Sequence, residues 1–451
     1  MNEGRENGAD SRFVHIITYG CQMNVFDTHR ILQVLRPLGY RETDDPAMAD
    51  LILLNTCSVR DRPEQKVIGT VTRLKPLKES RPDMMMGVCG CVGQQHGRAL
   101  LDRLPWLDLV FGTDNILDLP DMLAATHKGR RVANTRRMKR REYEFVGVDP
   151  AVERGPTAFL TIIKGCDKVC TYCIVPRVRG REVSKPADVV EAEVRSLVAS
   201  GVRDVTLLGQ NVNSYGKDLQ DGPDFTGLLE RLDGIPGLSR LRFVTSHPAD
   251  ADQGMLECFG RLPRLAEYLH LPVQSGSNRI LKLMRRGYTV REYLRCIDTA
   301  RKASPDIAVS TDFIVGFPGE TDEDHRMSLD LIRAVRFDAI FSFKYSPRPG
   351  TRAVRMEDDV PEEVKAARLL ELQTLQDGIM AERMSRFLGR VEEVLVEGPS
   401  RASGFEWMGR TRTNRIVNFP PPEGASIGPG DLVDVRIDEI KAHSLRGTVL
   451  P

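Results

Sequence analysis

Three cysteines lie within nine residues in the stretch GCDKVCTYC: Cys166, Cys170 and Cys173. Thiolates this close together in the sequence can share one metal centre. A structural zinc ion would require a fourth Cys or His ligand, but the next such residues are His247 and Cys258. Three ligands on a cubane iron–sulfur cluster leave one iron open for a substrate. We therefore expect a cluster here, with zinc and a ligand from elsewhere in the chain as the alternative.

Three further cysteines each follow a different apolar run. Cys21 follows HIITYG, Cys57 follows LILLNT and Cys91 follows MMMGVCG. Within residues 13–127 such runs alternate with helical patterns, which indicates an open parallel α/β sheet with helices on both faces. Because the carboxyl ends of parallel strands meet at one edge of such a sheet, we expect these three cysteines to converge.

The last three cysteines are interpreted as buried thiols. Cys89 competes with Cys91 for the second set, but it lies inside the apolar run and is typical of a small buried residue. Cys258 and Cys296 lie in helical patterns with no cysteine nearby. Gly90 and Gly93 flank Cys91 and would let backbone pack close to a bulky cluster.

The elements that carry the first cysteine set form a second α/β series from residue 157. Six candidate strands alternate with helical patterns over about 190 residues, which favours a partial or complete βα barrel, (βα)6 in a TIM-like arrangement. The GCDKVCTYC loop directly follows the first strand, on the reactive face of such a barrel. After Gly389, short β-rich runs broken by Gly and Pro predict a small antiparallel β-barrel.

Composition narrows the class of protein. The chain has 451 residues, 41% hydrophobic and 28% charged residues and a net charge of +1, which is typical of a globular protein of several domains without a global field for nucleic acid. No stretch predicts a membrane span or a signal peptide, so we expect a cytoplasmic protein whose cysteines are not in disulfides. Residues 128–141, KGRRVANTRRMKRR, hold eight basic residues and are either a solvated linker or a polyanion contact.

The cysteine motifs resemble a known family. GCDKVCTYC resembles the radical S-adenosylmethionine (SAM) superfamily, and GCQMN, NTCSVR and GCVGQ resemble the N-terminal domain of the methylthiotransferases. RGRE, LLGQNVNSYG, LHLPVQSGSNRIL, TDFIVGFPGET and YSPRPGT resemble the central radical SAM domain, and the last segment resembles an RNA-binding TRAM barrel. The resemblance implies a methylthiotransferase domain over 13–129, a radical SAM domain over 152–382 and a TRAM domain over 385–448.

The resemblance also implies the chemistry. It gives two [4Fe-4S] clusters, one on Cys166, Cys170 and Cys173 and an auxiliary one on Cys21, Cys57 and Cys91. SAM is both radical source and methyl donor, sulfur comes through the auxiliary cluster, and no side chain acts as acid or base. GCQMN, IVPRVRGRE and MGRTRTNRIVNF are similar to the branch that methylthiolates C2 of isopentenylated adenosine 37 of tRNA. Further implied partners are an electron donor such as flavodoxin or ferredoxin and an iron–sulfur carrier.

Candidate SAM contacts follow the predicted barrel strands, where polar side chains face the reactive side. Loop capping is the alternative role for these residue types. The candidates are Tyr172, Gln210, Asn211, Asn213, Ser246, His247, Gln274 with Ser275, and Gly316, Pro318 and Gly319 of the VGFPGE turn, which the resemblance places near adenine.

Candidate RNA contacts are basic and amide side chains, which suit phosphates and single-stranded loops. Arg179 and Arg181 follow the cysteine loop and could hold a carboxylate or phosphate, or simply lie on the surface. Phe405 and Trp407 could stack on bases or belong to the barrel core. The candidates in the last domain are Arg410, Arg412, Asn414, Arg415 and Asn418.

Two other functions stay open. A methylthiotransferase could act instead on a ribosomal-protein aspartate or on threonylcarbamoyladenosine. A protein of another class, a non-catalytic RNA-binding protein with structural metal sites, would also explain the basic run and the last barrel.

Overall fold

The computed structural model describes residues 12–58, 61–400, 403–421 and 426–450, with only the backbone for 61–65. The chain folds into two compact units. The N-terminal unit contains the residues up to Glu153 together with Lys164–Asp167 and Ile174–Val183. The C-terminal unit contains Arg154–Ile163, Lys168–Cys173 and everything from Ser184. The cysteine loop is thus divided between the units.

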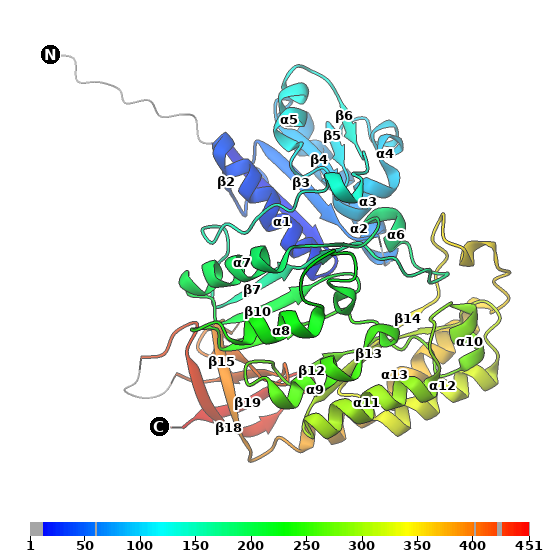
Figure 1. Cartoon of the computed structure of the whole chain (residues 1–451). Helices are drawn as coiled ribbons and strands as arrows, with labels where there is room; N and C mark the ends of the chain where they lie inside the picture. Colours follow the sequence, from blue (N-terminus) through cyan, green and yellow to red (C-terminus); the bar gives the residue numbers. More distant parts are fainter. Residues whose placement is uncertain (1–11, 59–60, 401–402, 422–425, 451) are drawn as a thin grey trace. The chain divides into compact units, whose positions relative to one another are not determined.

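The N-terminal unit is built on one six-stranded sheet in which every pair is parallel, in the order β2-β1-β3-β4-β5-β6 (Figure 1). The strands are β1 (Arg12–Tyr19), β2 (Tyr40–Glu42), β3 (Leu51–Thr56), β4 (Met85–Cys89), β5 (Leu109–Phe111) and β6 (Val132–Asn134). The helices are α1 (Gln22–Leu35), α2 (Asp61–Ser80), α3 (Gly90–His96), α4 (Arg98–Arg103), α5 (Leu119–His127) and α6 (Val175–Val178). The predicted open parallel sheet is confirmed.

Hydrophobic packing covers both faces of this sheet. Successive side chains of β3 point to opposite faces, so Leu51 and Leu53 join one buried cluster while Ile52 and Leu54 join another. The two edge strands β2 and β6 were not predicted, because each has only three residues and no apolar run. Strand β6 lies within the basic run 128–141, so part of that segment is sheet edge.

The C-terminal unit contains the six predicted barrel strands as two parallel three-stranded sheets, in the orders β11-β10-β7 and β12-β13-β14. They are β7 (Thr157–Thr161), β10 (Asp204–Leu208), β11 (Arg240–Phe243), β12 (Tyr268–His270), β13 (Ala308–Val315) and β14 (Ala339–Lys344). Two short strands, β8 (Ile163–Lys164) and β9 (Val183–Ser184), precede and follow the cysteine loop in the sequence. This arrangement fits the expected partial βα barrel.

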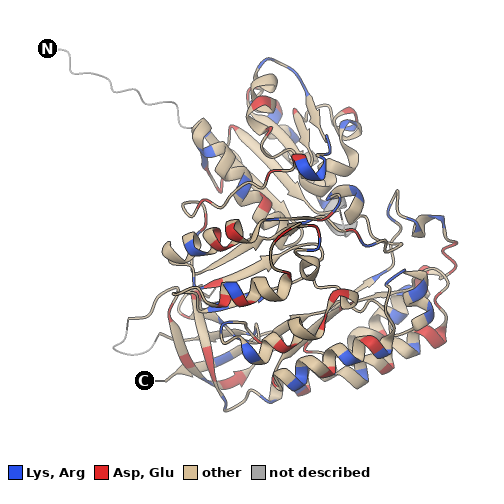
Figure 2. Ribbon diagram, in the orientation of Figure 1, with Lys and Arg blue, Asp and Glu red and all other residues tan. Residues whose placement is uncertain are grey.

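Amphipathic helices alternate with these strands. They are α7 (Ala187–Ala199), α8 (Phe225–Asp233), α9 (Gln253–Arg261), α10 (Asn278–Leu283), α11 (Val290–Ala303), α12 (Asp322–Val335) and α13 (Glu362–Ser385). Figure 2 shows charges of both signs along α11–α13. Among the residues that the structure describes, no helix combines the length and apolarity needed to cross a bilayer.

The last strands close a small barrel in the order β15-β16-β17-β19-β18. They are β15 (Val391–Pro399), β16 (Trp407–Thr411), β17 (Ile416–Phe419), β18 (Leu432–Ile440) and β19 (Leu445–Val449). All neighbours are antiparallel except β17 and β19, which pair in parallel. The predicted small β-barrel is confirmed, with this one parallel pair as the difference.

Buried arginines attach this barrel to the βα strands of the same unit. Arg242 of β11 pairs with Asp204 at 2.7 Å and donates to the carbonyl oxygens of Thr411 at 3.0 Å and Arg412 at 2.9 Å. Neighbouring Arg240 donates to the carbonyl and the carboxylate of Glu393. Both guanidinium groups are buried, and a hydrogen bond in such a low-dielectric environment is electrostatically stronger than in water.

Replacing Arg242 by Ala is expected to lower the free energy of unfolding of this unit by about 3–5 kcal/mol, since Asp204 would remain buried and unpaired. Urea unfolding followed by circular dichroism measures the change. The control is Arg436→Ala, which removes an exposed pair with Asp438 and should cost less than about 1 kcal/mol. Equal effects of the two variants would contradict the docking role of Arg242.

Candidate cluster and cofactor sites

Three thiols meet at the carboxyl edge of the N-terminal sheet. Cys21 follows β1 and begins α1, Cys57 follows β3, and Cys91 lies in the first turn of α3 after β4. These three strands are neighbours in the sheet. The Cys57 thiol is hydrogen-bonded to both Cys21 and Cys91. Residues far apart in the sequence are thereby within contact of one another.

The three thiols differ in how easily they ionise. The hydrogen bond with Cys57 is the largest effect on the pKa of Cys21, which is lowered to about 6, and of Cys91, which is lowered to about 7. The positive charge of Arg179 lowers both further, at Cys91 against the effect of burial. The same hydrogen bonds raise the pKa of Cys57 well above its usual value. Thiolates are the form that binds metal, so two members of the set are close to that form.

No group of three His, Cys, Asp or Glu side chains among the described residues surrounds a point closely enough to hold a metal ion. An iron–sulfur cluster on the three cysteines of the N-terminal unit therefore stays a prediction.

Polar residues and glycines shape the backbone around these thiols. Asn24 accepts from the Cys21 thiol at 3.4 Å and donates to buried Asn55 at 3.2 Å. Gly20 has φ +136°, and a Cβ there would lie 2.4 Å from that of Cys57. Gly90, expected to make room for a cluster, instead has φ +79° and would place a Cβ 2.4 Å from Asn55 Oδ1. The close approach at Gly90 is thus to the protein itself.

Arg179 holds a carboxylate of the protein itself instead of lying on the surface. Its side chain is buried, with Nη2 donating to Asp27 at 2.6 Å and Nε donating to the Cys91 sulfur at 3.3 Å. The expected exposed contact with RNA is wrong for Arg179, because its side chain is buried and donates to Asp27 and Cys91 inside the N-terminal unit. Arg181 is exposed and lies 3.5 Å from Asp167.

Arg286 holds the cysteine loop of the C-terminal unit. It donates to the Cys170 sulfur at 3.4 Å, to Tyr288 Oη at 3.0 Å and to the Pro272 carbonyl at 2.9 Å. The loop is also fixed by its backbone, since Thr171 N–H donates to Met284. Cys166, in the other unit, donates through its backbone N–H to Gly180. Nothing in the sequence pattern indicated Arg286, which lies more than a hundred residues after the loop.

The expected SAM contacts after β10 and β11 form one polar network. Asp250 accepts from Asn211 at 2.8 Å, from Lys168 of the cysteine loop at 2.7 Å and from Lys217 at 2.6 Å. Burial alone would raise the pKa of Asp250, but these hydrogen bonds lower it to about 2. Asn213 uses both amide atoms on the backbone of His247. The two asparagines therefore position this loop.

Two buried polar atoms at the end of β11 fit an additional binding group. Ser246 Oγ and His247 Nε2 have no hydrogen-bond partner among the described residues. Burial, with help from the charges of Arg286 and Lys168, lowers the pKa of His247 to about 2, so its imidazole is neutral. Leaving such atoms without partners costs about 1–3 kcal/mol each. A polar cofactor such as SAM would satisfy them.

The remaining expected SAM residues lie on neighbouring loops. Gln274 is buried with φ +76°, and its backbone bridges to β13. Ser275 is buried and accepts from the Ser277 N–H, while Gln210 is half-buried. The Tyr172 ring meets Phe317 edge-on at 6.5 Å, which links the cysteine loop to the VGFPGE turn.

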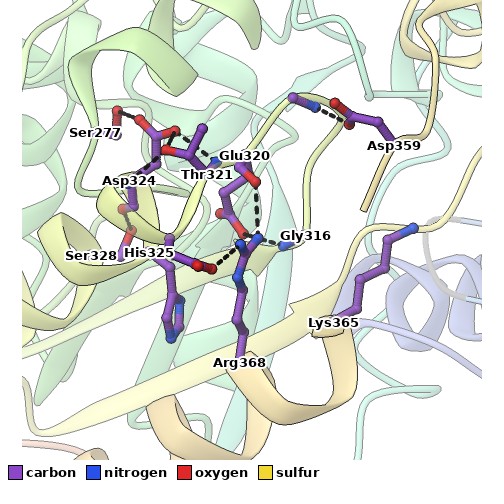
Figure 3. A network of polar contacts seen from close by, with 12 residues as sticks. Ser277, Gly316, Glu320, Thr321, Asp324, His325, Ser328, Asp359, Lys365 and Arg368 are labelled. Atoms are coloured by element: carbon purple, nitrogen blue, oxygen red, sulfur yellow. Dashed lines mark hydrogen bonds and ion pairs between the residues drawn. The ribbon is translucent and has the colours of Figure 1, made fainter. Parts of the chain in front are cut away.

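Two backbone hydrogen bonds and one ion pair fix the VGFPGE turn (Figure 3). Gly316 N–H donates to Glu320 at 2.6 Å, Glu320 pairs with Arg368 of α13 at 2.9 Å, and Gly319 N–H donates to Asp359 at 2.6 Å. Gly316 has φ +66°, and a Cβ there would lie 2.3 Å from Lys365 Cγ. The turn between Gly316 and Gly319, with Pro318, is therefore held in one shape that depends on glycine.

Replacing Gly316 by Ala is expected to lower the free energy of unfolding by about 1–3 kcal/mol, because the left-handed backbone and the contact with Lys365 both resist a Cβ. Thermal unfolding of the purified chain measures the effect. Gly378→Ala is the matched control: Gly378 lies inside α13 with open space around it, so alanine should stabilise by about 0.5–1 kcal/mol. A neutral Gly316→Ala variant would show that the turn tolerates another shape.

The basic strand of the C-terminal barrel is used largely within the protein. Arg412 pairs with Glu267 at 2.7 Å and Arg415 pairs with Asp338 at 3.0 Å. Both charges are thus paired within the same unit, and contact of these two residues with RNA stays a prediction. The Arg410 side chain is 34% exposed and pairs with Glu397 at 3.0 Å.

Some of the amide and aromatic side chains expected to contact RNA are bonded or packed within the barrel, and one is exposed. Asn414 accepts from Arg410 at 3.4 Å, and Asn418 accepts from Ser400 at 2.9 Å. Trp407 packs against the barrel core, whereas Phe405 is 91% exposed. Stacking on a base is therefore possible for Phe405 and sterically restricted for Trp407.

The basic run keeps several exposed charges. Arg136, Lys139 and Arg141 are exposed, with Lys139 3.8 Å from Glu142, while Arg131 donates to three backbone carbonyls. Arg140 pairs with Asp167 at 3.0 Å.

The cysteines outside the two sets are buried or half-buried: Cys89, Cys258 and Cys296.

Comparisons with known proteins agree with this architecture. Three family models match: uncharacterized protein family UPF0004 over residues 13–112, the Radical SAM superfamily over 160–332 and the TRAM domain over 385–450. Proteins of Burkholderia multivorans and Burkholderia thailandensis, both called tRNA-2-methylthio-N(6)-dimethylallyladenosine synthase, are 45% identical over 443 residues. The match covers 97% of this chain and 97% of each relative. The chain belongs to this family, the MiaB family.

Solved structures with the same fold support the family at the level of architecture. The radical S-adenosylmethionine methyltransferase TsrM from Kitasatospora setae has a TM-score of 0.56 at 16% identity, covering 76% of this chain and 77% of that chain. The cobalamin-dependent S-adenosylmethionine radical enzyme OxsB has a TM-score of 0.51 at 13% identity, covering 81% and 56%. At these identities the likeness is one of fold. The resemblance to the methylthiotransferases is confirmed by the family match.

Proposed function

We propose that the protein methylthiolates C2 of N6-isopentenyladenosine at position 37 of tRNA. The observation that carries the proposal is the meeting of the Cys21, Cys57 and Cys91 thiols in a chain that also has a radical SAM loop. A radical enzyme that only cleaves SAM needs one three-cysteine set, whereas sulfur insertion needs a second site to hold sulfur. Membership of the MiaB family supports tRNA as the substrate.

We infer that Cys166, Cys170 and Cys173 hold one [4Fe-4S] cluster and that Cys21, Cys57 and Cys91 hold the auxiliary one. When bound, the clusters and SAM would supply a carbon radical able to break the unactivated C2–H bond, together with the sulfur and methyl group that replace the hydrogen. The chain's own contribution is to hold and shield them. Arg286 positions the Cys170 side, and Asn24 positions the Cys21 side.

SAM would be held by the loops after the barrel strands. Ser246 and His247 offer polar atoms that have no partner among the described residues, and a neutral imidazole can donate or accept a hydrogen bond. Asn211 and Asn213 keep that loop in place, together with Asp250. We propose, from the family resemblance, that the turn at Gly316–Gly319 lies near the adenine, with Gln210 and Gln274 as further contacts.

For tRNA, we propose contacts from side chains that keep part of their surface. Arg181 and Phe405 are exposed, Arg410 and Asn418 are half-buried, and the Phe405 ring can stack on a base. The target adenine must leave its stack to be modified. We further propose a cytoplasmic location, a flavodoxin or ferredoxin as electron donor, and an iron–sulfur carrier as cluster source.

Complementation of a deletion strain with variants that lack one cysteine set at a time tests the function. In a strain lacking this gene, the parent chain and the Cys89→Ala control should restore the methylthiolated isopentenyladenosine peak in digested tRNA. Neither the Cys21/Cys57/Cys91→Ala variant nor the Cys166/Cys170/Cys173→Ala variant should do so, because each loses one cluster. Mass spectrometry of the nucleosides is the measurement.

The same purified variants separate the rival functions. After anaerobic reconstitution the parent should bind about eight irons and each triple variant about half as many. Zinc alone in the parent, or no 5′-deoxyadenosine after reduction with dithionite, would favour a non-catalytic RNA-binding protein. A peak that persists in the deletion strain would point to a ribosomal-protein aspartate or threonylcarbamoyladenosine as substrate.

Exposed charges of the basic run are expected to contact tRNA phosphates. Replacing Arg136, Lys139 and Arg141 by Gln should reduce the slope of log affinity against log salt by about 2–3, at roughly 0.7–0.9 per contact. Fluorescence anisotropy with labelled tRNA at several salt concentrations gives the slope. The control replaces exposed Arg73, Arg98 and Arg103 of the same unit by Gln. An equal slope for the basic-run variant and parent would leave 128–141 a linker.

A further inference from the structure

A buried cation lies beside the second cysteine set. Arg179 is only 4% exposed, and its guanidinium group donates to two acceptors, the Cys91 sulfur at 3.3 Å and the Asp27 carboxylate at 2.6 Å. Asp27 is itself buried. The charge of Arg179 acts on the Cys21 sulfur as well as on Cys91. A full positive charge in the protein interior, shielded from water, is stable only when negatively charged groups lie beside it.

The backbone around Arg179 leaves it little freedom. Ile174 and Val178 form a small apolar cluster with Cys91, and the Val178 carbonyl accepts from Thr113 at 2.8 Å. Arg179 N–H closes the end of α6 by donating to Val175. Asp27 fixes the far end of the side chain. The direction of the Nε–H bond toward Cys91 is therefore set by packing on one side and by an ion pair on the other.

We propose that Arg179, anchored by Asp27, is a positioning residue that raises the reduction potential of the auxiliary cluster through its bond to Cys91. This rests on the proposed function, which puts a cluster on Cys21, Cys57 and Cys91. Reduction adds negative charge to the cluster. A hydrogen bond to a ligand sulfur and a buried cation both stabilise that charge, so they favour the reduced form.

The side chain suits this role better than lysine would. A guanidinium group can donate from Nε to sulfur and from Nη2 to a carboxylate at the same time, because its donors are fixed in one plane. An ammonium group at this position keeps the charge but has no matching pair of donors. Arg179→Lys should therefore retain part of the effect, and Arg179→Gln should lose it.

The test uses the full chain with Cys166, Cys170 and Cys173 replaced by Ala, so that only the auxiliary set can hold a cluster. A mediated redox titration followed by electron paramagnetic resonance gives the midpoint potential. Arg179→Gln should shift the potential downward, Arg179→Lys should lie between Gln and parent, and the control Arg177→Gln should match the parent. Arg177 is exposed in α6, directly before Arg179 caps that helix, and Arg177→Gln removes one positive charge as Arg179→Gln does.

Each outcome decides the point. A potential that is the same in Arg179→Gln and Arg177→Gln overturns the inference while leaving the proposed cluster intact. If Arg179→Gln takes up no iron, Arg179→Lys decides instead: a potential below the parent supports the role, and an equal one overturns it. A parent that binds no cluster at all overturns the proposed auxiliary site, and the inference with it.

Discussion

Parallel strands end together at one edge of a sheet, and the meeting of the N-terminal thiols depends on that constraint. β1, β3 and β4 are neighbours, so three cysteines separated by more than thirty residues each meet at their carboxyl ends. The glycine at position 20 and the buried asparagines around it then set the fine spacing. Three thiols from three separate strand ends meet in this way, whereas Cys166, Cys170 and Cys173 come from one short segment.

Buried arginines supply the electrostatic counterpart of these thiols. One guanidinium group donates to Cys91 in the N-terminal unit, and another donates to Cys170 in the C-terminal unit. A buried guanidinium group keeps its charge, and in a low dielectric medium that charge acts strongly on nearby sulfur. Each set of cysteines is thus paired with a permanent cation that is itself held by Asp27 or by Tyr288 and a carbonyl.

The arginines of the C-terminal barrel show that local composition does not reveal which charges are paired in the folded chain. The segment MGRTRTNRIVN is locally basic, which predicted contact with RNA. In the folded chain Arg412 and Arg415 pair with Glu267 and Asp338 of the same unit. Those carboxylates lie far away in the sequence, so local charge could not reveal that the positive charges were already neutralised.

The sequence by itself determined the strand and helix pattern, the barrel at the end of the chain and the two groups of cysteines. These follow from local periodicity and from strand ends, which short-range rules describe well. Only the tertiary structure decided that Arg179 is buried against Cys91, that Arg286 reaches Cys170 and that Ser246 and His247 keep polar atoms available. Such contacts join residues tens to more than a hundred positions apart, and long-range packing, which no local pattern encodes, places them together.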